Sequence, residues 1–387
     1  MAIDGAKELQ KVRAYLSHMV KNKGSDLHIK AESVFRARVQ GSIKPLGKEI
    51  FTAEQAEAFA KELLGERYEE FVENKEMDMV YPFDEDSRFR VNMFYQMNGI
   101  SAVFRVIPLK IPKLDDLNLP EVIKSFVEVE RGLILVTGVT GSGKSTTLAA
   151  LVSEVNRTKE KHIITIEDPI EFVHEDNKCI VNQRSVGQDT LSFGKALKSA
   201  LREDPDIILV GEMRDMETIN LALHAADTGH LVFSTLHTLD AKETINRIIS
   251  TFPTNEQNRV RLSLSGVIQG IISQRLVKTK DGGRRAAMEI LVRTATIEKL
   301  IMENRDYEIK DAMEAGKPIY KSQSFDQSLI DLYNEGVITK AEAKINASSP
   351  ADLELKMSGL SGGGAASADE NEIQKFTPGD EDVFDLK

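Results

Sequence analysis

A glycine-rich loop near the middle of the chain constrains the fold more than any other feature. The stretch from Gly138 to Ser145 matches the pattern G-x-x-x-x-G-K-S/T, follows the apolar run 133–136 and precedes a segment with helical periodicity. Glycines let backbone N–H groups curl around phosphate oxygens, and the N-terminus of the next helix adds partial positive charge. A strand, this loop and a helix in sequence therefore predict a site for the phosphates of a nucleotide.

Two side chains of the loop have chemistry that suits a nucleotide. We expect Lys144 to reach the β- and γ-phosphates and the hydroxyl of Ser145 to be a ligand of Mg²⁺. The residues expected to bind the nucleotide are Gly138, Thr140, Gly141, Ser142, Gly143, Lys144, Ser145 and Thr146.

Apolar runs alternate with helical patterns around this loop. The runs are 133–136, 163–166, 207–210 and 231–233, and each ends in polar or small residues. Leu148, Leu151 and Val155 have helical spacing after the first run. Apolar strands that alternate with helices are typical of a parallel sheet covered on both faces. The predicted fold class is therefore α/β.

A carboxylate follows the third apolar run. Glu212 stands at the carboxyl end of the predicted strand, where doubly wound sheets place their ligands. Strands of this kind usually end in Asp, whereas here Gly211 has that place. We interpret Glu212 as the residue that orients or deprotonates the attacking water, with a contact to Mg²⁺ through water. The alternative is a solvated glutamate that begins a loop.

Two further segments lie at predicted strand ends. Glu167, Asp168 and Glu171 follow the second apolar run, and three acids so close together repel one another unless a cation such as Mg²⁺-nucleotide is near. His230 and His237 stand at the two ends of the fourth run. Two interpretations of this histidine pair stay open, namely sensors of nucleotide state and ordinary histidines with local partners.

The first 110 residues have the pattern of a small α+β domain. Helices are expected at 9–20 and, with Thr52 as a cap, up to about residue 64. The strands are expected at 27–29, 34–39, 88–94 and 101–107. Charged and apolar residues alternate in the stretch 88–94, which places Arg88 and Arg90 on one face of that strand.

Changes in composition mark the domain boundaries. Pro108, Pro112 and Pro120 indicate an extended linker, because proline fixes φ and lacks a backbone donor. After Leu360 the chain becomes rich in Ser, Gly and Ala and then acidic, which is typical of disorder. The predicted organisation is an N-terminal domain 1–110, a linker 111–120, a nucleotide-binding domain 121–294, a helical segment 295–357 and a disordered acidic tail 358–387.

Composition excludes several classes of function. The net charge of the 387 residues is −11, so a global basic surface for nucleic acid is absent. The single cysteine, Cys179, forms neither an intrachain disulfide nor a multi-cysteine zinc site. Neither an apolar run approaching 18 residues nor the apolar core of a signal peptide occurs, so we expect a cytosolic protein without membrane insertion.

Taken together, these segments resemble the type IV pilus and type II secretion ATPase superfamily. Four segments occur in the order of that family and carry the resemblance: the Walker A segment 138–146, an acidic box 165–171, the Walker B segment 204–215 and a His box 228–238. The resemblance spans roughly 20–357. It implies a RecA-like P-loop ATPase domain, a smaller PAS-like α+β N-terminal domain, a hexameric assembly, and ATP with Mg²⁺ as cofactors.

The resemblance also implies roles for single residues. Glu212 matches the catalytic glutamate of the family, and Glu167 matches a contact of the acidic box. Arginines of the N-terminal domain reach the nucleotide in such rings, and Arg90 and Arg105 have the matching positions. A solvated strand face is the alternative for these arginines. The catalytic candidates are Glu212, Glu167, Arg90, Arg105, His230 and His237.

Within the superfamily, the sequence resembles the retraction branch of PilT and PilU. Assembly and secretion members carry a further N-terminal domain and a tetracysteine zinc insertion, for which one cysteine does not suffice. The stretch 296–303 lacks the two arginines found there in PilT members, and 325–333 is similar to PilU-type members. The expected function is a motor for type IV pilus retraction and twitching motility, acting alone or as an accessory to a paralogous retraction ATPase. The expected location is the cytoplasmic face of the inner membrane, against a pilus platform protein.

Other functions stay open at this point. A pilus assembly or secretion ATPase shares the same phosphate chemistry. RecA-like rings also translocate DNA, although phosphate contacts require clustered Lys and Arg that an acidic chain lacks. A scaffold that binds ATP with little turnover is disfavoured by the intact Lys144, Ser145 and Glu212.

Overall fold

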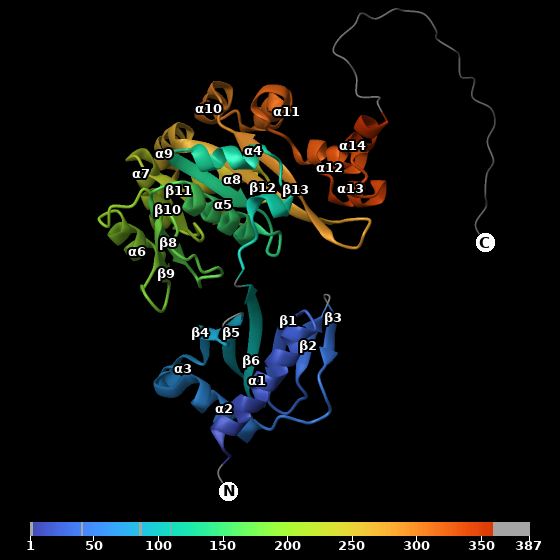
Figure 1. Ribbon diagram of the computed structural model, residues 1–387. Coiled ribbons are helices and arrows are strands. Elements are labelled where there is room, and N and C mark those ends of the chain that lie inside the picture. Colours follow the sequence, from blue (N-terminus) through green and yellow to red (C-terminus); the bar gives the residue numbers. More distant parts are fainter. Residues whose placement is uncertain (1–2, 40–41, 85–86, 109, 359–387) are drawn as a thin grey trace, which may run out of the picture.

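The computed structural model describes residues 3–39, 42–84, 87–108 and 110–358. The predicted tail 358–387 lies outside the described residues apart from Ser358. Two α/β bodies follow one another along the chain, and Figure 1 shows the N-terminal body in blue below the larger one.

The N-terminal domain is built on a six-stranded antiparallel sheet with the strand order β3-β2-β1-β6-β5-β4. Its strands are β1 (Gly24–Lys30), β2 (Arg36–Val39), β3 (Ser42–Pro45), β4 (Glu76–Pro82), β5 (Ser87–Gln96) and β6 (Gly99–Pro108). Its helices are α1 (Gly5–Lys21), α2 (Ala53–Leu64) and α3 (Tyr68–Asn74). The predicted cap of α2 is present, because Thr52 and Gln55 form a reciprocal capping box.

The two faces of this sheet differ in chemistry. Phe89 and Val91 of β5 are fully buried in an aromatic core beneath α1 and α2, together with Phe104 of β6. The predicted alternation is confirmed, since Arg88 and Arg90 are partly exposed between these buried residues. The face away from the helices therefore carries the arginines.

The connection to the second domain differs from an extended linker. It contains a 3₁₀ turn at Leu114–Leu117, the short helix α4 (Val122–Ser125) and a second 3₁₀ turn at Phe126–Glu128. Leu114 is buried in the same core as Ile123 and Phe126. The prolines thus interrupt regular structure without keeping the chain away from the domain, because Leu114 between them and Phe126 after them gain apolar contacts.

The second domain has a seven-stranded sheet with the order β13-β12-β7-β11-β10-β8-β9. Its strands are β7 (Gly132–Thr137), β8 (His162–Glu167), β9 (Ile180–Ser185), β10 (Ile207–Val210), β11 (Leu231–Leu236), β12 (Ile268–Lys278) and β13 (Arg284–Val292). All neighbouring pairs are parallel except β12 with β13. The four strands predicted from apolar runs are β7, β8, β10 and β11, and they occupy the centre of this sheet.

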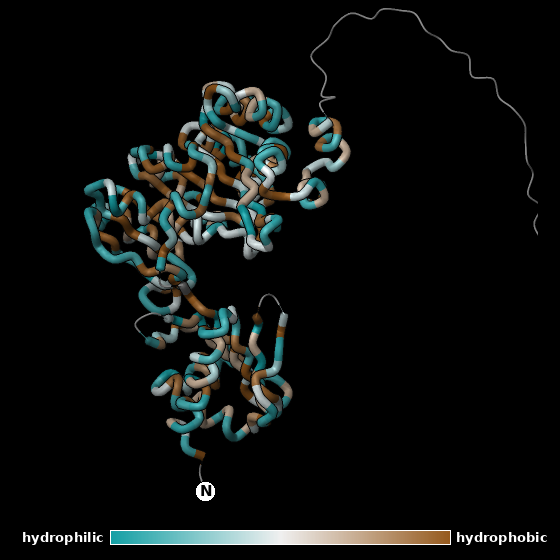
Figure 2. The backbone as a smooth tube through the Cα atoms, turned by 45° about the vertical axis from the view of Figure 1, so that its right-hand side comes forward, coloured by the Kyte–Doolittle hydropathy of each residue, from teal (hydrophilic) through white to brown (hydrophobic). Residues whose placement is uncertain are grey.

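Helices cover both faces of the sheet, as the apolar strands require. Alternate residues of β7 enter two separate cores: Ile134 packs with α5 (Lys144–Thr158), and Leu133 packs on the opposite face. That opposite face is covered by α6 (Phe193–Ala200), α7 (Met216–Asp227), α8 (Ala241–Ser250) and α9 (Thr254–Val267). Figure 2 shows brown apolar strands at the centre of this domain and teal segments at its surface.

The C-terminal helices extend the second domain. They are α10 (Ala295–Met302), α11 (Ile309–Tyr320), α12 (Phe325–Asn334), α13 (Lys340–Asn346) and α14 (Pro350–Met357). The apolar face of α10, formed by Ile297, Leu300 and Ile301, is buried in the domain core. Helices α12 to α14 form a smaller core against β12 and β13. Among the described residues, no helix has the length and apolar character needed to cross a membrane.

Candidate active site

The glycine-rich loop joins the central strand β7 to helix α5, as predicted. Three of its glycines have positive φ, with Gly138 at 137°, Gly141 at 81° and Gly143 at 93°. A Cβ at Gly138 would lie 2.5 Å from the carbonyl oxygen of Gln274 and 2.6 Å from Ser142 Oγ. Gly143 is the N-cap of α5 and supplies no side-chain cap, so the first N–H groups of that helix are free of side-chain partners.

Lys144 lies at the centre of this loop. Its Nζ donates hydrogen bonds to the carbonyl oxygens of Gly138 at 2.7 Å and Val139 at 3.2 Å. The residue is only 8% exposed. Burial lowers the pKa of Lys144, while the charges of Glu212 and Glu171 oppose that change. A buried ammonium held by neutral carbonyls is well suited to an incoming phosphate.

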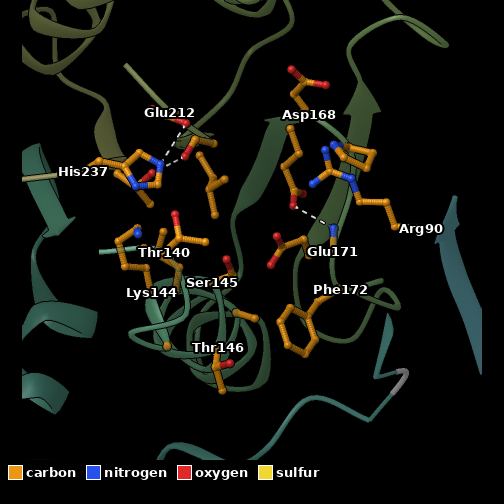
Figure 3. Close-up of a pocket in the computed structure, with 18 of the residues that line it drawn as sticks. Arg90, Thr140, Lys144, Ser145, Thr146, Asp168, Glu171, Phe172, Glu212 and His237 are labelled. Atoms are coloured by element: carbon orange, nitrogen blue, oxygen red, sulfur yellow. Dashed lines mark hydrogen bonds and ion pairs between the residues drawn. The ribbon is translucent and has the colours of Figure 1, made fainter. Parts of the chain in front are cut away.

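A cavity of about 490 Å³ opens beside the loop and contains most of the predicted site. Of the predicted residues, it is lined by Thr140, Gly141, Gly143, Lys144, Ser145, Thr146, Glu167, Glu212, His237, Arg90 and Arg105. Gly138 and Ser142 instead line a separate cavity of about 260 Å³ on the other side of the loop, with Gln274 of β12. Figure 3 shows the loop residues, Glu212 and His237 around one space, with Arg90 extending toward the segment of Asp168 and Glu171.

Glu212 follows β10 and is held by Arg214 and His237. Arg214 Nη2 lies 2.7 Å from Glu212 Oε2, and His237 Nε2 lies 3.4 Å from the same oxygen. Burial alone raises the pKa of Glu212, but the hydrogen bond from Arg214 and the nearby His237 outweigh it and lower the pKa. Glu212 is therefore an ionised acceptor at neutral pH, oriented at the edge of the cavity.

Glu167 at the end of β8 has a different environment. Its Oε1 accepts hydrogen bonds from Thr165 Oγ1 at 2.7 Å and Gln183 Nε2 at 3.2 Å. Burial raises the pKa of Glu167 despite these bonds. The carboxyl group thus ties β8 to β9 as well as facing the cavity. One residue further along the chain, the peptide bond between Asp168 and Pro169 is cis.

The two histidines of the predicted pair lie at opposite ends of β11. His237 reaches the cavity and Glu212. His230 precedes the strand, and its Nδ1 lies 2.9 Å from the carbonyl oxygen of Ala225. Because all residues of β11 separate them, the structure does not bring His230 to the cavity. Of the two histidines, His237 lines the cavity and His230 does not.

Arg90 and Arg105 enter the cavity from the N-terminal domain. They are direct partners in the antiparallel register of β5 and β6. Arg90 Nε lies 3.8 Å from Asp78, and Arg105 Nε donates to Asp26 over 2.7 Å. The structure therefore brings both predicted arginines to the same space as Lys144 within one chain.

Two basic residues of the cavity, Arg214 and His174, were not predicted from the sequence. Arg214 was not singled out, although it stands two residues after Glu212. His174 also lines the cavity, and burial lowers its pKa to about 4, so its imidazole is neutral at pH 7. The only local signal for His174 is its position shortly after the three acids.

The donor set fits a magnesium nucleotide better than a metal ion alone. Among the described residues, no group of three or more His, Cys, Asp or Glu side chains could hold a metal ion. Ser145, at the second position of α5, and Glu212 would supply oxygens directly or through water, and phosphate oxygens would complete the shell. The uncapped helix start and the three positive-φ glycines form the cradle that phosphates require.

Known proteins are similar to this chain over most of its length. The family model described as "Type II/IV secretion system protein" matches residues 4–328. The chain belongs to this family. The crystal structure of the pilus retraction motor PilT with bound ADP superposes on this chain with a TM-score of 0.82. That structure is 43% identical, and the match covers 89% of this chain and 98% of the other.

Two curated relatives within the type II/IV secretion family come from Pseudomonas aeruginosa. The type IV pilus retraction ATPase PilT is 47% identical over 336 residues, which cover 87% of this chain and 97% of PilT. The type IV pilus ATPase PilU is 41% identical over 339 residues, which cover 87% of this chain and 88% of PilU. The predicted resemblance to the PilT and PilU branch is confirmed, and over the whole matched length the identity is higher to PilT.

Proposed function

We propose that this chain is an ATP-hydrolysing motor that powers type IV pilus retraction and thereby twitching motility. The observation that carries the proposal is a complete phosphate cradle, with Lys144 and Glu212 in place, in a chain that matches 97% of the length of PilT. The ADP in the PilT structure supports a nucleotide as the ligand of the cavity.

The geometry supports a division of labour in the cavity. Lys144 and the N-terminus of α5 bind the phosphates, and Ser145 provides an oxygen for Mg²⁺. Glu212, kept ionised by Arg214, orients or deprotonates the attacking water. Arg90 and Arg105 stabilise the negative charge that develops on the transferred phosphoryl group.

The motor works as a homohexamer in this proposal, at the cytoplasmic face of the inner membrane and against the pilus platform protein. PilT and PilU each match 87% of this chain. The replacement of both arginines in the stretch 296–303 favours the accessory role. Glu298 there pairs with Arg293 at 2.8 Å, and Met302 is 47% exposed.

Deletion of the gene in its own bacterium tests the function. Cells without this protein should carry normal or excess surface pili and lose pilus-dependent surface motility. Complementation with wild type should restore motility, whereas complementation with Glu212→Gln should not. Bald cells would contradict retraction and indicate pilus assembly instead.

A second strain tests the accessory role. Where a PilT-type paralogue exists, retraction should need both proteins, and the purified protein should still hydrolyse ATP. Full retraction with this protein as the sole motor would disprove the accessory role and leave the retraction assignment standing. ATP hydrolysis that DNA stimulates in a salt-sensitive manner would instead favour a nucleic-acid motor.

A further inference from the structure

Four charged residues form one row across the N-terminal sheet. In the strand register, Arg38 of β2 pairs with Asp26 of β1, Asp26 pairs with Arg105 of β6, and Arg105 pairs with Arg90 of β5. Leu27 and Phe104, the sequence neighbours of Asp26 and Arg105, are fully buried in the core beneath α1 and α2. Because neighbouring residues of a strand face opposite sides, the row lies on the face away from these helices. Three arginines and one aspartate thus lie side by side across the sheet.

Asp26 is the buried member of this row. It is only 3% exposed, whereas the Arg105 side chain is 63% exposed. Asp26 Oδ1 accepts from Arg105 Nε at 2.7 Å, and Oδ2 accepts from Ser25 Oγ at 2.7 Å with Arg38 Nε at 3.6 Å. Burial raises the pKa of Asp26, but Ser25 and Arg105 outweigh it, so the carboxylate stays ionised.

The pairing through Nε has a consequence for the geometry of Arg105. A guanidinium presents five N–H donors in a rigid planar fork. When Nε is engaged by Asp26, the plane of the fork is fixed and the two terminal nitrogens remain available for the cavity that Arg105 lines. Arg90, directly opposite on β5, has a longer contact of 3.8 Å to the half-exposed Asp78.

Electrostatics within the row make Asp26 necessary for this arrangement. Like charges directly opposite each other on neighbouring strands repel. Arg90 and Arg105 are such a pair, and Arg38 adds a third cation two strands away. An ionised Asp26 offsets this repulsion at the position nearest to Arg105.

We propose that Asp26 is a positioning residue for ATP hydrolysis, which holds the Arg105 guanidinium in the orientation that meets the nucleotide. The proposal rests on the role of Arg105 in the proposed function. Asp26 itself does not contact the nucleotide and acts only through Arg105. Its loss should therefore lower kcat and leave KM for ATP nearly unchanged, since such arginines stabilise transition-state charge.

The first experiment measures steady-state ATP hydrolysis of the full-length chain with two variants at this position. Asp26→Asn keeps the size and an acceptor oxygen but removes the charge, and kcat should fall about tenfold with KM within about twofold. Asp26→Glu keeps the charge and should recover part of kcat. Glu49→Gln removes a carboxylate of the same domain that pairs with Lys11 and should behave as wild type.

The second experiment separates positioning from general stability. Arg105→Gln should lower kcat by roughly 10³-fold. Adding Asp26→Asn to Arg105→Gln should lower kcat no further, because Asp26 then has no arginine to orient. A merely structural Asp26 would give an additional fall in the double variant, equal losses for Asn and Glu, and a parallel loss of melting temperature, and these results would overturn the proposal.

Failure of the inference is distinguishable from failure of the proposed function. If Arg105→Gln lowers kcat and Asp26→Asn does not, the positioning role is wrong and the role of Arg105 stands. If Arg105→Gln turns over ATP like wild type, the assignment of Arg105 is wrong and the inference falls with it. If Asp26→Asn does not fold, Asp26→Glu takes its place. Its kcat is then measured alone and in combination with Arg105→Gln, and a further fall of kcat in the double variant overturns the positioning role.

Discussion

Gln274 of β12 donates a hydrogen bond from Nε2 to the carbonyl oxygen of Ser142, over 3.1 Å. Gln274 is 2% exposed, and 132 residues separate it from the glycine-rich loop that it supports. The loop is therefore held from its far side by a strand that also carries the C-terminal helices α12 to α14. This contact leads to the first prediction.

Gln274→Leu should weaken nucleotide binding without unfolding the chain. Leucine matches the size of glutamine but leaves the Ser142 carbonyl without its partner, at a cost of about 1–3 kcal/mol. We expect roughly a tenfold or greater loss of affinity for ATP, measured by titration with a fluorescent ATP analogue. Gln323→Leu is a matched control, because that buried glutamine donates to the Met288 carbonyl away from the loop. An equal loss of affinity in both variants would show that the effect is general.

Lys144→Ala should abolish tight nucleotide binding, since the cation at the β- and γ-phosphates is lost. A ligand at 100 times its Kd stabilises a protein by about 2.7 kcal/mol, so saturating ATP should raise the melting temperature of wild type by several degrees. The variant should melt at the same temperature with and without ATP. Wild-type affinity in Lys144→Ala would disprove the phosphate-site assignment.

Glu212→Gln should bind ATP and stop hydrolysis. The amide still accepts the hydrogen bond from Arg214 but is a far weaker base than the carboxylate. Rapid-quench and binding measurements should show full affinity and no turnover, while Glu256→Gln, at an exposed pair with Arg259, should hydrolyse ATP normally. Because the pKa of Glu212 is lowered, wild type should keep this base ionised in mildly acidic buffer. Substantial turnover in Glu212→Gln would place the base elsewhere, with Glu167 or Glu171 as the next candidates.

Glu289 should make stability depend on pH near neutrality. This carboxyl of β13 is 5% exposed, and burial raises its pKa from 4.5 to about 7. A raised pKa in the folded state gives stability that is present below the unfolded pKa and is lost as pH rises through about 7. At pH 8 the loss is at most about 3 kcal/mol, at 1.36 kcal/mol per pKa unit.

Glu289→Gln isolates this effect, because its amide oxygen can still accept from the Ala241 N–H, as Glu289 does at 2.9 Å. Melting temperatures of the variant and wild type should agree near pH 5, and the variant should melt higher at pH 8. Glu298→Gln, at a partly exposed carboxyl that pairs with Arg293, is the control and should not melt above wild type at pH 8. A difference between Glu289→Gln and wild type that is the same at pH 5 and pH 8 would contradict the assigned ionisation of Glu289.

Local sequence patterns were sufficient for the central strands and for the phosphate loop. Apolar runs and glycine spacing report backbone geometry within a few residues, so β7, the loop and the start of α5 could be predicted. The alternation around Arg90 predicted its face correctly for the same reason. Such patterns require no knowledge of which strands pair.

Long-range pairing accounts for what the sequence did not reveal. Asp26 meets Arg105 across 79 residues, and Gln274 meets Ser142 only because β12 joins the sheet next to β7. Spacing along α10 does not reveal what its apolar face packs against, which is the core of the second domain.

The position of Arg105 along β6 determines how far this residue moves when the two domains rotate relative to each other. The strand ends at Pro108, three residues beyond Arg105, and leads directly toward the second domain. At about 3.3 Å per residue, the lever arm from the end of the strand to the Arg105 Cα is only about 10 Å. A rotation of roughly 10° about this point shifts that Cα by about 2 Å. Catalytic groups must be held to within about 0.5 Å, so under the proposed function even this short lever arm lets a small change in the angle between the domains connect or disconnect Arg105.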